Sequence, residues 1–257
     1  MSTRADVALV ERGLVRSRTL ARRLIEAGAV LTDGPGGEVP VTRAAQPIFP
    51  DQPLRVAASG ASRFVSRGGN KLDAALQAAG IDCTGLDALD VGMSTGGFTH
   101  CLLARGARQV LGIEVGHGQL DPVLAADPRV HCLEHTHIRD VHLADLRLPD
   151  GSAPAQGFAL IVVDLSFIAA SHLLDKLATL AAPGGRLTCL IKPQFELGPQ
   201  ARNRQGIVRA DADLDGLRRD VIQRAEDAGW QVNDWQRCAL VGGDGNQEYF
   251  LIATRRP

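Results

Sequence analysis

Apolar and polar positions change their spacing along the chain near residue 70. Before that point, short periodic stretches predict helices over 5–13 and 18–27, with Ser17 as the N-cap of the second helix. Strands are expected at 29–34, 39–41 and 54–56. These elements favour a small α+β domain over residues 1–58, and the small residues that follow indicate a linker, which we place at 59–65.

After residue 70, apolar runs of strand length alternate with amphipathic stretches of helix length. We expect helices at 70–79, 98–105, 168–181 and 213–228, and strands at 86–91, 109–115, 129–133, 158–163, 186–191, 231–240 and 247–253. This alternation predicts an α/β domain over residues 66–257, with a Rossmann-like, doubly wound and mostly parallel sheet. Ligands of such sheets bind at the carboxyl ends of the strands.

A glycine-rich turn follows the first strand of the larger domain. It reads Asp90, Val91, Gly92, Met93, Ser94, Thr95, Gly96, Gly97, Phe98. Glycines let a ligand approach the backbone, and the helix N-terminus offers free N–H groups. A dinucleotide site would carry glycine in place of Ser94. Asp90 suits a cationic amine, and Glu114, at the end of the second strand, suits the hydroxyls of a ribose. We therefore favour S-adenosylmethionine (SAM) over NAD, the simpler alternative being a structural tight turn.

Four ionisable residues are expected at the same edge of the sheet. Asp164 and Lys192 each follow an apolar strand, Glu248 opens the last strand, and Lys71 lies just before the sheet. Alone, each has an ordinary explanation as a helix cap or a solvated charge, but together they predict a catalytic group. Methyl transfer to a hydroxyl needs a base, and lysine can release a proton near neutral pH whereas arginine cannot. We expect Lys192 to be that base, with Lys71 promoting its deprotonation and the carboxylates holding both amines.

Composition changes this picture in one respect. The chain has 28 Lys+Arg in 257 residues, and only Lys71, Lys176 and Lys192 are lysine. Basic residues gather toward the N-terminus, where residues 1–71 carry a net charge of +5 and the remainder −6. This asymmetry favours a polyanion partner such as RNA, although a solvated helix face is an equally simple explanation. For RNA contacts we expect Arg4, Arg16, Arg18, Arg22, Arg23 and Arg67.

Several classes of protein are disfavoured. The five cysteines form no CxxC pair, and no spacing suggests a metal site. No N-terminal signal peptide and no apolar run of about 20 residues is present, so we expect a cytoplasmic protein that does not span a membrane. Aromatic residues make up only 4% of the chain, which disfavours an extended platform for stacking bases.

Seven ordered blocks resemble a known family. The N-terminal block, RADVALVERGLVRSRTLARRLIEAGAVL, resembles the RNA-binding module of a small-subunit ribosomal protein and several RNA-modifying enzymes. The blocks FVSRGGNKLDAAL, LDVGMSTGGFTHCLLARGA, EVGHGQL, IVVDLSFI, LIKPQFE and GGDGNQEYFL are similar to those of the TlyA family. These are FtsJ-like ribosomal RNA 2′-O-methyltransferases that have also been labelled haemolysins.

The resemblance implies specific roles. The family's Lys-Asp-Lys-Glu tetrad falls on Lys71, Asp164, Lys192 and Glu248, and its SAM loop on 90–98. The implied activity is SAM-dependent 2′-O-methylation of a cytidine in rRNA. The few residues after Glu248 favour the shorter type, which modifies the large subunit. This chain departs from the family pattern at Glu114, where aspartate is usual, and at His100, Ala5 and Thr136-His137.

Three other functions remain open at this point. The chain can be an RNA- or ribosome-binding protein with an inactive methyltransferase domain. It can be a membrane-lytic haemolysin, although no basic amphipathic helix with bulky aromatic residues supports this. A nicotinamide-dependent oxidoreductase is the weakest alternative, because the glycine pattern differs from a dinucleotide loop.

Overall fold

The computed structural model describes residues 2–15, 17–26, 30–34, 37–56, 63–242 and 245–257. The chain divides into two compact units, residues 1–63 and 64–257. The division falls inside the expected linker at 59–65, of which residues 59–62 lie outside the described residues.

The first unit is a small α+β fold. It comprises β1 (Thr3–Arg4), α1 (Ala5–Glu11), α2 (Arg18–Glu26), β2 (Val30–Gly34), β3 (Gly37–Pro40), β4 (Pro47–Ile48) and β5 (Leu54–Val56). The strands form an antiparallel sheet of order β3-β2-β5 and a separate β1-β4 pair. As predicted, Ser17 caps α2, because the Leu20 amide donates to its hydroxyl at 3.2 Å. The two-residue strands β1 and β4 were not predicted.

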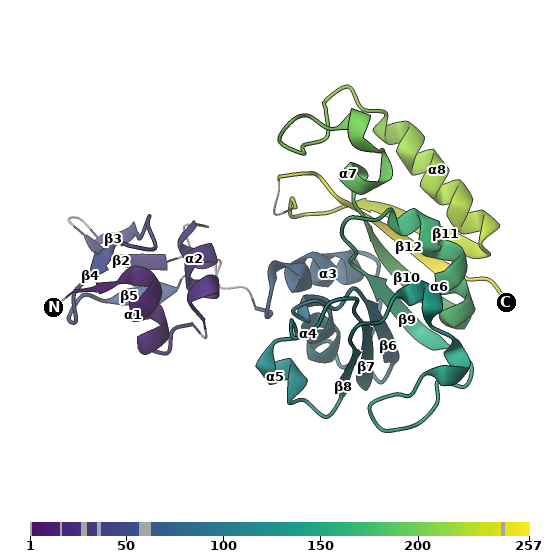
Figure 1. Ribbon diagram of the computed structural model, residues 1–257, viewed down its shortest axis with the longest axis horizontal. Helices are drawn as coiled ribbons and strands as arrows, with labels where there is room; N and C mark the ends of the chain where they lie inside the picture. Colours follow the sequence, from purple (N-terminus) through teal and green to yellow (C-terminus); the bar gives the residue numbers. More distant parts are fainter. Residues whose placement is uncertain (1, 16, 27–29, 35–36, 57–62, 243–244) are drawn as a thin grey trace. The chain divides into compact units, whose positions relative to one another are not determined.

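The second unit contains a seven-stranded sheet with helices on both faces (Figure 1). Its strands are β6 (Asp87–Val91), β7 (Gln109–Ile113), β8 (Val130–Leu133), β9 (Phe158–Val163), β10 (Ala181–Ile191), β11 (Trp230–Arg237) and β12 (Tyr249–Arg255). The strand order is β11-β12-β10-β9-β6-β7-β8. The strands from β10 to β8 run parallel, and β12 and β11 close one edge antiparallel. The predicted fold class is therefore confirmed.

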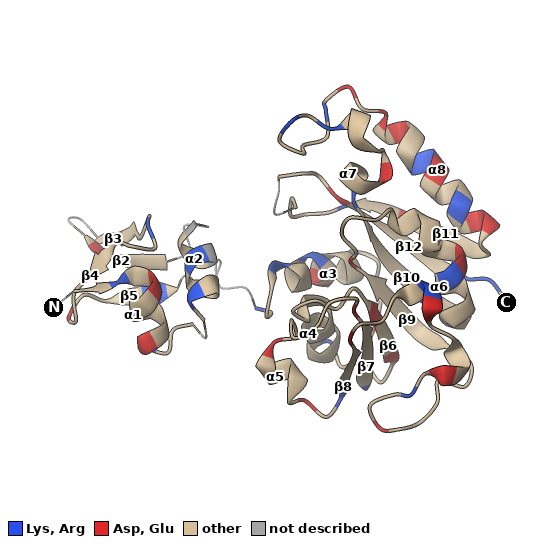
Figure 2. Cartoon of the chain, viewed as in Figure 1, with Lys and Arg blue, Asp and Glu red and all other residues tan. Residues whose placement is uncertain are grey.

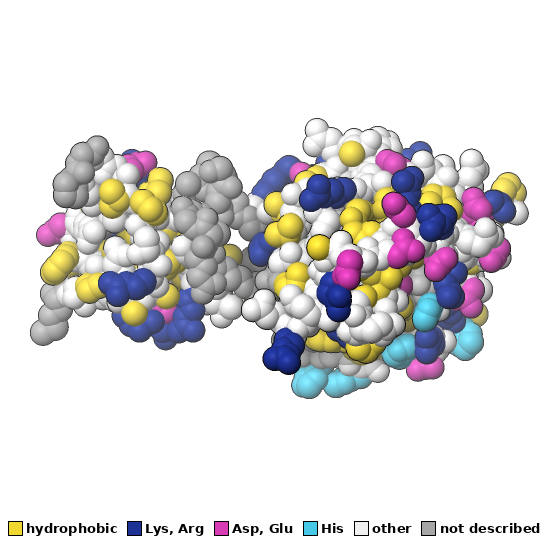
Figure 3. Space-filling model, turned by 90° about the horizontal axis from the view of Figure 1, so that it is seen from above, with side chains coloured by type: hydrophobic (Ala, Val, Ile, Leu, Met, Phe, Trp, Pro, Cys, Tyr) yellow, Lys and Arg dark blue, Asp and Glu magenta, His cyan; other side chains and the backbone are white. Residues whose placement is uncertain are grey.

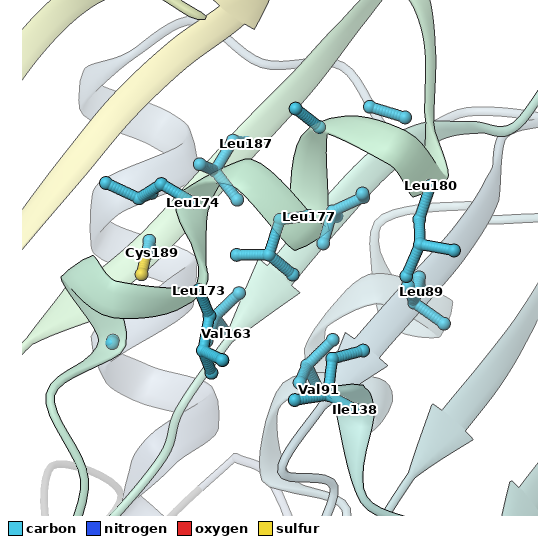
Figure 4. Close-up of a cluster of buried hydrophobic side chains, with 14 of the residues drawn as sticks. Leu89, Val91, Ile138, Val163, Leu173, Leu174, Leu177, Leu180, Leu187 and Cys189 are labelled. Carbon is cyan, nitrogen blue, oxygen red and sulfur yellow. The ribbon is translucent and has the colours of Figure 1, made fainter. Parts of the chain in front are cut away.

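The helices of this unit cover the two faces of the sheet. They are α3 (Arg67–Ala78), α4 (Gly97–Ala104), α5 (Pro122–Ala125), α6 (Leu174–Leu180), α7 (Pro193–Glu196) and α8 (Leu214–Asp227). Along β9, Leu160 and Val162 pack in the core that includes α3 and α4, whereas Ile161 and Val163 pack in the core that includes α6 and α8. Figure 4 shows the second core, in which leucines of α6 lie against the sheet. A strand buried on both faces explains the continuous apolar run FALIVV.

Several element boundaries differ from the predictions, and two helices show the reasons most clearly. Helix α3 begins at Arg67 and includes Gly68 and Gly69, which weaken a sequence-based helix assignment. Gly69 fits because a Cβ there would lie 2.4 Å from Phe64. The predicted helix 168–181 is shorter than expected: a 3-10 turn at Ala170–Leu173 leads into α6, and Ala181 already begins β10 opposite Phe158.

Candidate active site

Three of the four predicted catalytic residues lie at strand ends on one edge of the sheet. Asp164 follows β9 and Lys192 follows β10, while Glu248 precedes β12. Strand β12 runs antiparallel to β10, with Ile191 opposite Tyr249. Continuing this register by one residue places Lys192, which follows Ile191, opposite Glu248, which precedes Tyr249. The topology therefore brings these residues, far apart in sequence, to one place.

The four side chains form two ion pairs. Lys192 Nζ lies 2.7 Å from Asp164 Oδ1, and Lys71 Nζ, from α3, lies 2.5 Å from Glu248 Oε2. Both lysines are largely buried, with 11% and 9% of their side chains exposed. Cys238 lies beside the second pair, because its amide donates to the Glu248 carbonyl at 2.9 Å, and burial raises the pKa of its thiol.

Ser166 contacts the predicted base and was not predicted. Lys192 Nζ donates a hydrogen bond to Ser166 Oγ at 2.9 Å. The same amine therefore has an ionic partner in Asp164 and a neutral partner two residues later in the same loop. The available signal was only that Ser166 lies in the same strand-end loop as Asp164, where ligands of parallel sheets bind.

A pocket of about 460 Å³ opens beside Asp164 and Ser166. The loops after β6, β7, β8 and β9 line it with apolar groups and a few polar ones, as is typical of small-molecule sites. Its lining includes Gly92, Ser94, Glu114, Gln119, Thr136, His137, Asp164, Ser166 and Phe167. Of the predicted cofactor residues, Gly92, Ser94 and Glu114 line this pocket, whereas Asp90, Thr95, Gly96, Gly97 and Phe98 are not part of its lining.

Gly92 is required by the packing of the turn. Its φ is +86°, and a Cβ there would lie 2.4 Å from the backbone oxygen of Asp164. The glycine thus lets the end of β6 pass directly against the end of β9, where Asp164 begins its loop. Gly97 has a similar steric reason, since a Cβ would meet Ser66 Oγ at 2.0 Å.

Asp90 lies beneath this turn and is completely buried. Its Oδ2 accepts hydrogen bonds from the Thr99 amide at 3.0 Å and the Thr99 hydroxyl at 2.7 Å. Its Oδ1 has no hydrogen-bond partner among the described residues. Burial raises the pKa of Asp90 to about 7. The negative charges of Asp164 and Glu114 also raise this pKa, whereas the hydrogen bonds from Thr99 lower it. An unpartnered, buried carboxylate oxygen fits a cationic ligand group.

Glu114 joins two loops of the pocket. Its Oε2 accepts from the Ser94 amide at 2.9 Å, and its Oε1 accepts from the Gly116 amide at 2.8 Å. The carboxylate lies one residue beyond the end of β7 and is mostly buried. Each oxygen retains acceptor capacity, so the side chain can shape the loops and still receive ligand hydroxyls.

Phe167 is an exposed aromatic ring at this pocket. Its side chain is 88% exposed, and its backbone has the unusual φ of +70°. Its ring centroid lies 5.5 Å from that of Phe195. Phe195 belongs to α7, the helix that begins directly after Lys192. A strained backbone that holds an apolar ring in solvent beside a cleft indicates a functional role. The low aromatic content of the chain gave no sign of this contact.

The predicted RNA-binding arginines divide into three groups. Arg4, Arg18 and Arg22 converge on the carboxylate of Asp6. Arg67, at the start of α3, is exposed and donates to the Val241 carbonyl at 2.9 Å. Arg16 and the side chain of Arg23 lie outside the described residues. Figure 2 shows that basic residues also mark α2.

Two further findings concern metal ligands and membrane-spanning helices. Across the described residues, no group of three His, Cys, Asp or Glu side chains is arranged to hold a metal ion. Within the same ranges, no helix has both the length and the apolar character needed to cross a membrane.

Known proteins resemble both units. Residues 64–255 match the FtsJ-like methyltransferase family, and residues 3–34 match the S4 domain. The chain is 39% identical to the 16S/23S rRNA (cytidine-2′-O)-methyltransferase TlyA of Mycobacterium tuberculosis, over 96% of this chain and 88% of that protein. It is 32% identical to Hemolysin A of Brachyspira hyodysenteriae, over 96% of this chain and 98% of that protein. A solved haemolysin-named structure from Streptococcus thermophilus superposes with a TM-score of 0.74 at 30% identity, covering 99% of this chain and 89% of that one.

Proposed function

Because the chain belongs to the TlyA family of FtsJ-like methyltransferases, we propose that it transfers a methyl group from SAM to the ribose 2′-oxygen of a cytidine in ribosomal RNA. We place the target in the large-subunit rRNA and the reaction in the cytoplasm, where ribosomes are assembled. The observation that carries the proposal is the pair of lysine–carboxylate contacts, Lys192–Asp164 and Lys71–Glu248, beside a pocket of about 460 Å³.

The residues around this pocket fit SAM. Glu114 lines the pocket and offers acceptors for the ribose hydroxyls. Asp90 is completely buried beneath the turn and outside the pocket lining, and we assign its unpartnered Oδ1 to the amine of the methionine moiety. Gly92 and Ser94 let the cofactor approach the backbone of the turn, while Thr95, Gly96, Gly97 and Phe98 shape the turn and the start of α4. When bound, SAM supplies an electrophilic methyl group on a positively charged sulfur.

Lys192 acts on the proton of the target hydroxyl. In its neutral form Nζ accepts that proton, and Asp164 and Ser166 then hold the resulting ammonium group. Lys71 places a second positive charge at the same edge of the sheet, and Glu248 holds Lys71 in the buried site. The carboxylates thereby prevent either buried amine from standing unpaired, which would destabilise the fold.

Phe167 offers a surface for the nucleotide base. A ribose hydroxyl within a folded RNA reaches a recessed site only when the nucleotide leaves its stack, and a stacking partner offsets part of that cost. Phe167 lines the pocket with an exposed side chain, and its ring centroid lies 5.5 Å from that of Phe195. Arg67, together with Arg4, Arg16, Arg18, Arg22 and Arg23, would contact RNA phosphates and set affinity more than sequence choice.

The test is methyl transfer from labelled SAM to ribosomal subunits that lack the modification. We expect label in large-subunit rRNA, mapped by mass spectrometry to a cytidine 2′-oxygen, and no label with Lys192→Ala. RNA binding without methyl transfer by the wild-type protein would instead support a ribosome-binding protein with an inactive domain. Membrane lysis is favoured only by the names of some relatives, and leakage of lipid vesicles at low protein concentration would revive it.

A further inference from the structure

The carboxylate of Asp6 lies at the centre of three arginines in the first unit. Although charged, the Asp6 side chain is completely buried. Its Oδ1 accepts from Arg4 Nε at 2.9 Å, and its Oδ2 accepts from Arg18 Nη2 at 3.0 Å and Arg22 Nε at 3.2 Å. The arginine side chains themselves remain about half exposed, at 48%, 53% and 52%.

This arrangement keeps Asp6 ionised and the arginines in place. The hydrogen bond from Arg4, with smaller contributions from Arg18 and Arg22, holds the pKa of Asp6 well below its usual range in spite of burial. Conversely, one fixed carboxylate orients three guanidinium groups that come from β1 and α2. Each guanidinium has five N–H donors, and Asp6 occupies only one or two of them.

We propose that Asp6 is a positioning residue that assembles Arg4, Arg18 and Arg22 into one preformed binding site for RNA phosphates. This inference rests on the proposed function only for the identity of the polyanion. Three positive groups around one negative group leave an excess of positive charge on half-exposed side chains, and Figure 3 shows Lys and Arg side chains gathered on the surface of this unit. Guanidinium groups match phosphate oxygens in pairs, and ordering them before binding reduces the entropy lost on association.

The proposal predicts a sign opposite to that of simple charge counting. Asp6 is negative, so its removal would strengthen binding of a polyanion if only net charge mattered. If Asp6 organises the arginines, its removal weakens binding, because three flexible side chains must then be ordered by the RNA itself.

The experiment measures binding of the full-length protein to an in vitro transcript of large-subunit rRNA at several salt concentrations. We expect Asp6→Asn to bind about tenfold more weakly at about 100 mM salt, with a log–log salt slope smaller by about 1 to 2, since each phosphate contact contributes about 0.7 to 0.9. The matched control is Asp33→Asn, which removes an exposed carboxylate from the same unit and should bind RNA equally or more tightly. Asp33→Asn should also leave SAM affinity and the rate of methylation at saturating RNA unchanged, whereas Asp6→Asn should raise KM for RNA more than it lowers kcat. Binding by Asp6→Asn that equals or exceeds wild type would overturn the proposal.

A second variant covers the case in which Asp6→Asn unfolds the first unit. Arg18→Lys keeps the charge but loses the two-nitrogen contact with Asp6, and Arg55→Lys makes the same change at an exposed arginine paired with Asp33. We expect weaker RNA binding and a smaller salt slope only for Arg18→Lys, and equal behaviour of the two variants would overturn the proposal. Absence of RNA binding by the wild-type protein is a separate outcome, because it would overturn the proposed function itself.

Discussion

Replacing Asp90 by Asn should stabilise the cofactor-free methyltransferase unit, and the gain should grow with pH. Asp90 is completely buried with a raised pKa of about 7, compared with 3.8 for an unperturbed aspartate. Asparagine retains an oxygen that can accept from both the amide and the hydroxyl of Thr99, so the turn into α4 keeps its hydrogen bonds. What changes is the charge that the folded protein must bury above neutral pH.

The magnitude follows from the two pKa values. Between about pH 4 and pH 7, the unfolded chain has lost the Asp90 proton while the folded protein still holds it, so the free energy of unfolding falls as pH rises. A difference of about three pH units at about 1.4 kcal/mol each gives at most about 4 kcal/mol of lost stability above pH 7. The Asn variant avoids this loss, so its advantage should be near zero at pH 4 and largest at pH 8.

The assay is denaturant unfolding followed by tryptophan fluorescence. Both tryptophans, Trp230 and Trp235, lie in residues 64–257, so the signal reports that unit without interference from the first. Asp175→Asn on the exposed surface of α6 is the control, and its effect should not vary with pH. The same Asp90→Asn variant should bind SAM more weakly by calorimetry, because it loses the negative charge proposed to meet the amine. Identical pH dependence of wild type and Asp90→Asn between pH 4 and 7 would refute the reasoning.

Four further predictions test the site. Lys192→Arg should lower the rate of methyl transfer at least about a hundredfold, because arginine cannot accept the proton. Lys176→Arg on α6 should keep full activity, and equal activities of the two variants would show that Lys192 is not the base. Ser166→Ala should lower kcat with little change in SAM affinity, since the hydroxyl contacts Lys192 Nζ; an unchanged kcat would contradict this role. Phe167→Ala should weaken RNA binding by about 1 to 3 kcal/mol, measured as a rise in KM for RNA, and an unchanged KM would rule out stacking. Gly92→Ala should abolish SAM binding by calorimetry, because the new Cβ would meet the Asp164 backbone oxygen at 2.4 Å; normal affinity would show that the turn can move.

The sequence predicts the sheet and the catalytic edge because both depend on local patterns. The strand Phe158–Val163 is buried on both faces and therefore has a continuous apolar sequence. Asp164, the ionisable residue directly after it, stands out for that reason as a candidate for the site. The order β12-β10-β9 was not predicted; it places Glu248 beside Lys192 and Asp164 at one edge of the sheet. Lys71 reaches Glu248 from α3, across 177 positions of sequence.

The parts that were missed depend on side-chain contacts with no sequence period. Ser166 and Phe167 are ordinary loop residues until the backbone turns them toward Lys192 and the pocket. Helix α7 has only four residues and begins at a proline, so it lacks the length that periodicity requires. Asp6 was not singled out in the sequence, because burial of its carboxylate depends on arginines twelve and sixteen residues away.

The contrast between the two cation–carboxylate groups explains the unusual use of lysine. Around Asp6, three arginines share one carboxylate and still present N–H donors outward, which requires a planar, permanently charged group. At the sheet edge, Asp164 and Glu248 each hold a lysine, whose compact amine can give up its proton and take one from a substrate. In a chain with only three lysines among its 28 basic residues, two stand where proton transfer is proposed. Since arginine is used at nearly all positions that need a fixed charge, the lysines at Lys71 and Lys192 are best explained by the chemistry of the amine. Lys176 tests this explanation, because its replacement by arginine should leave activity unchanged.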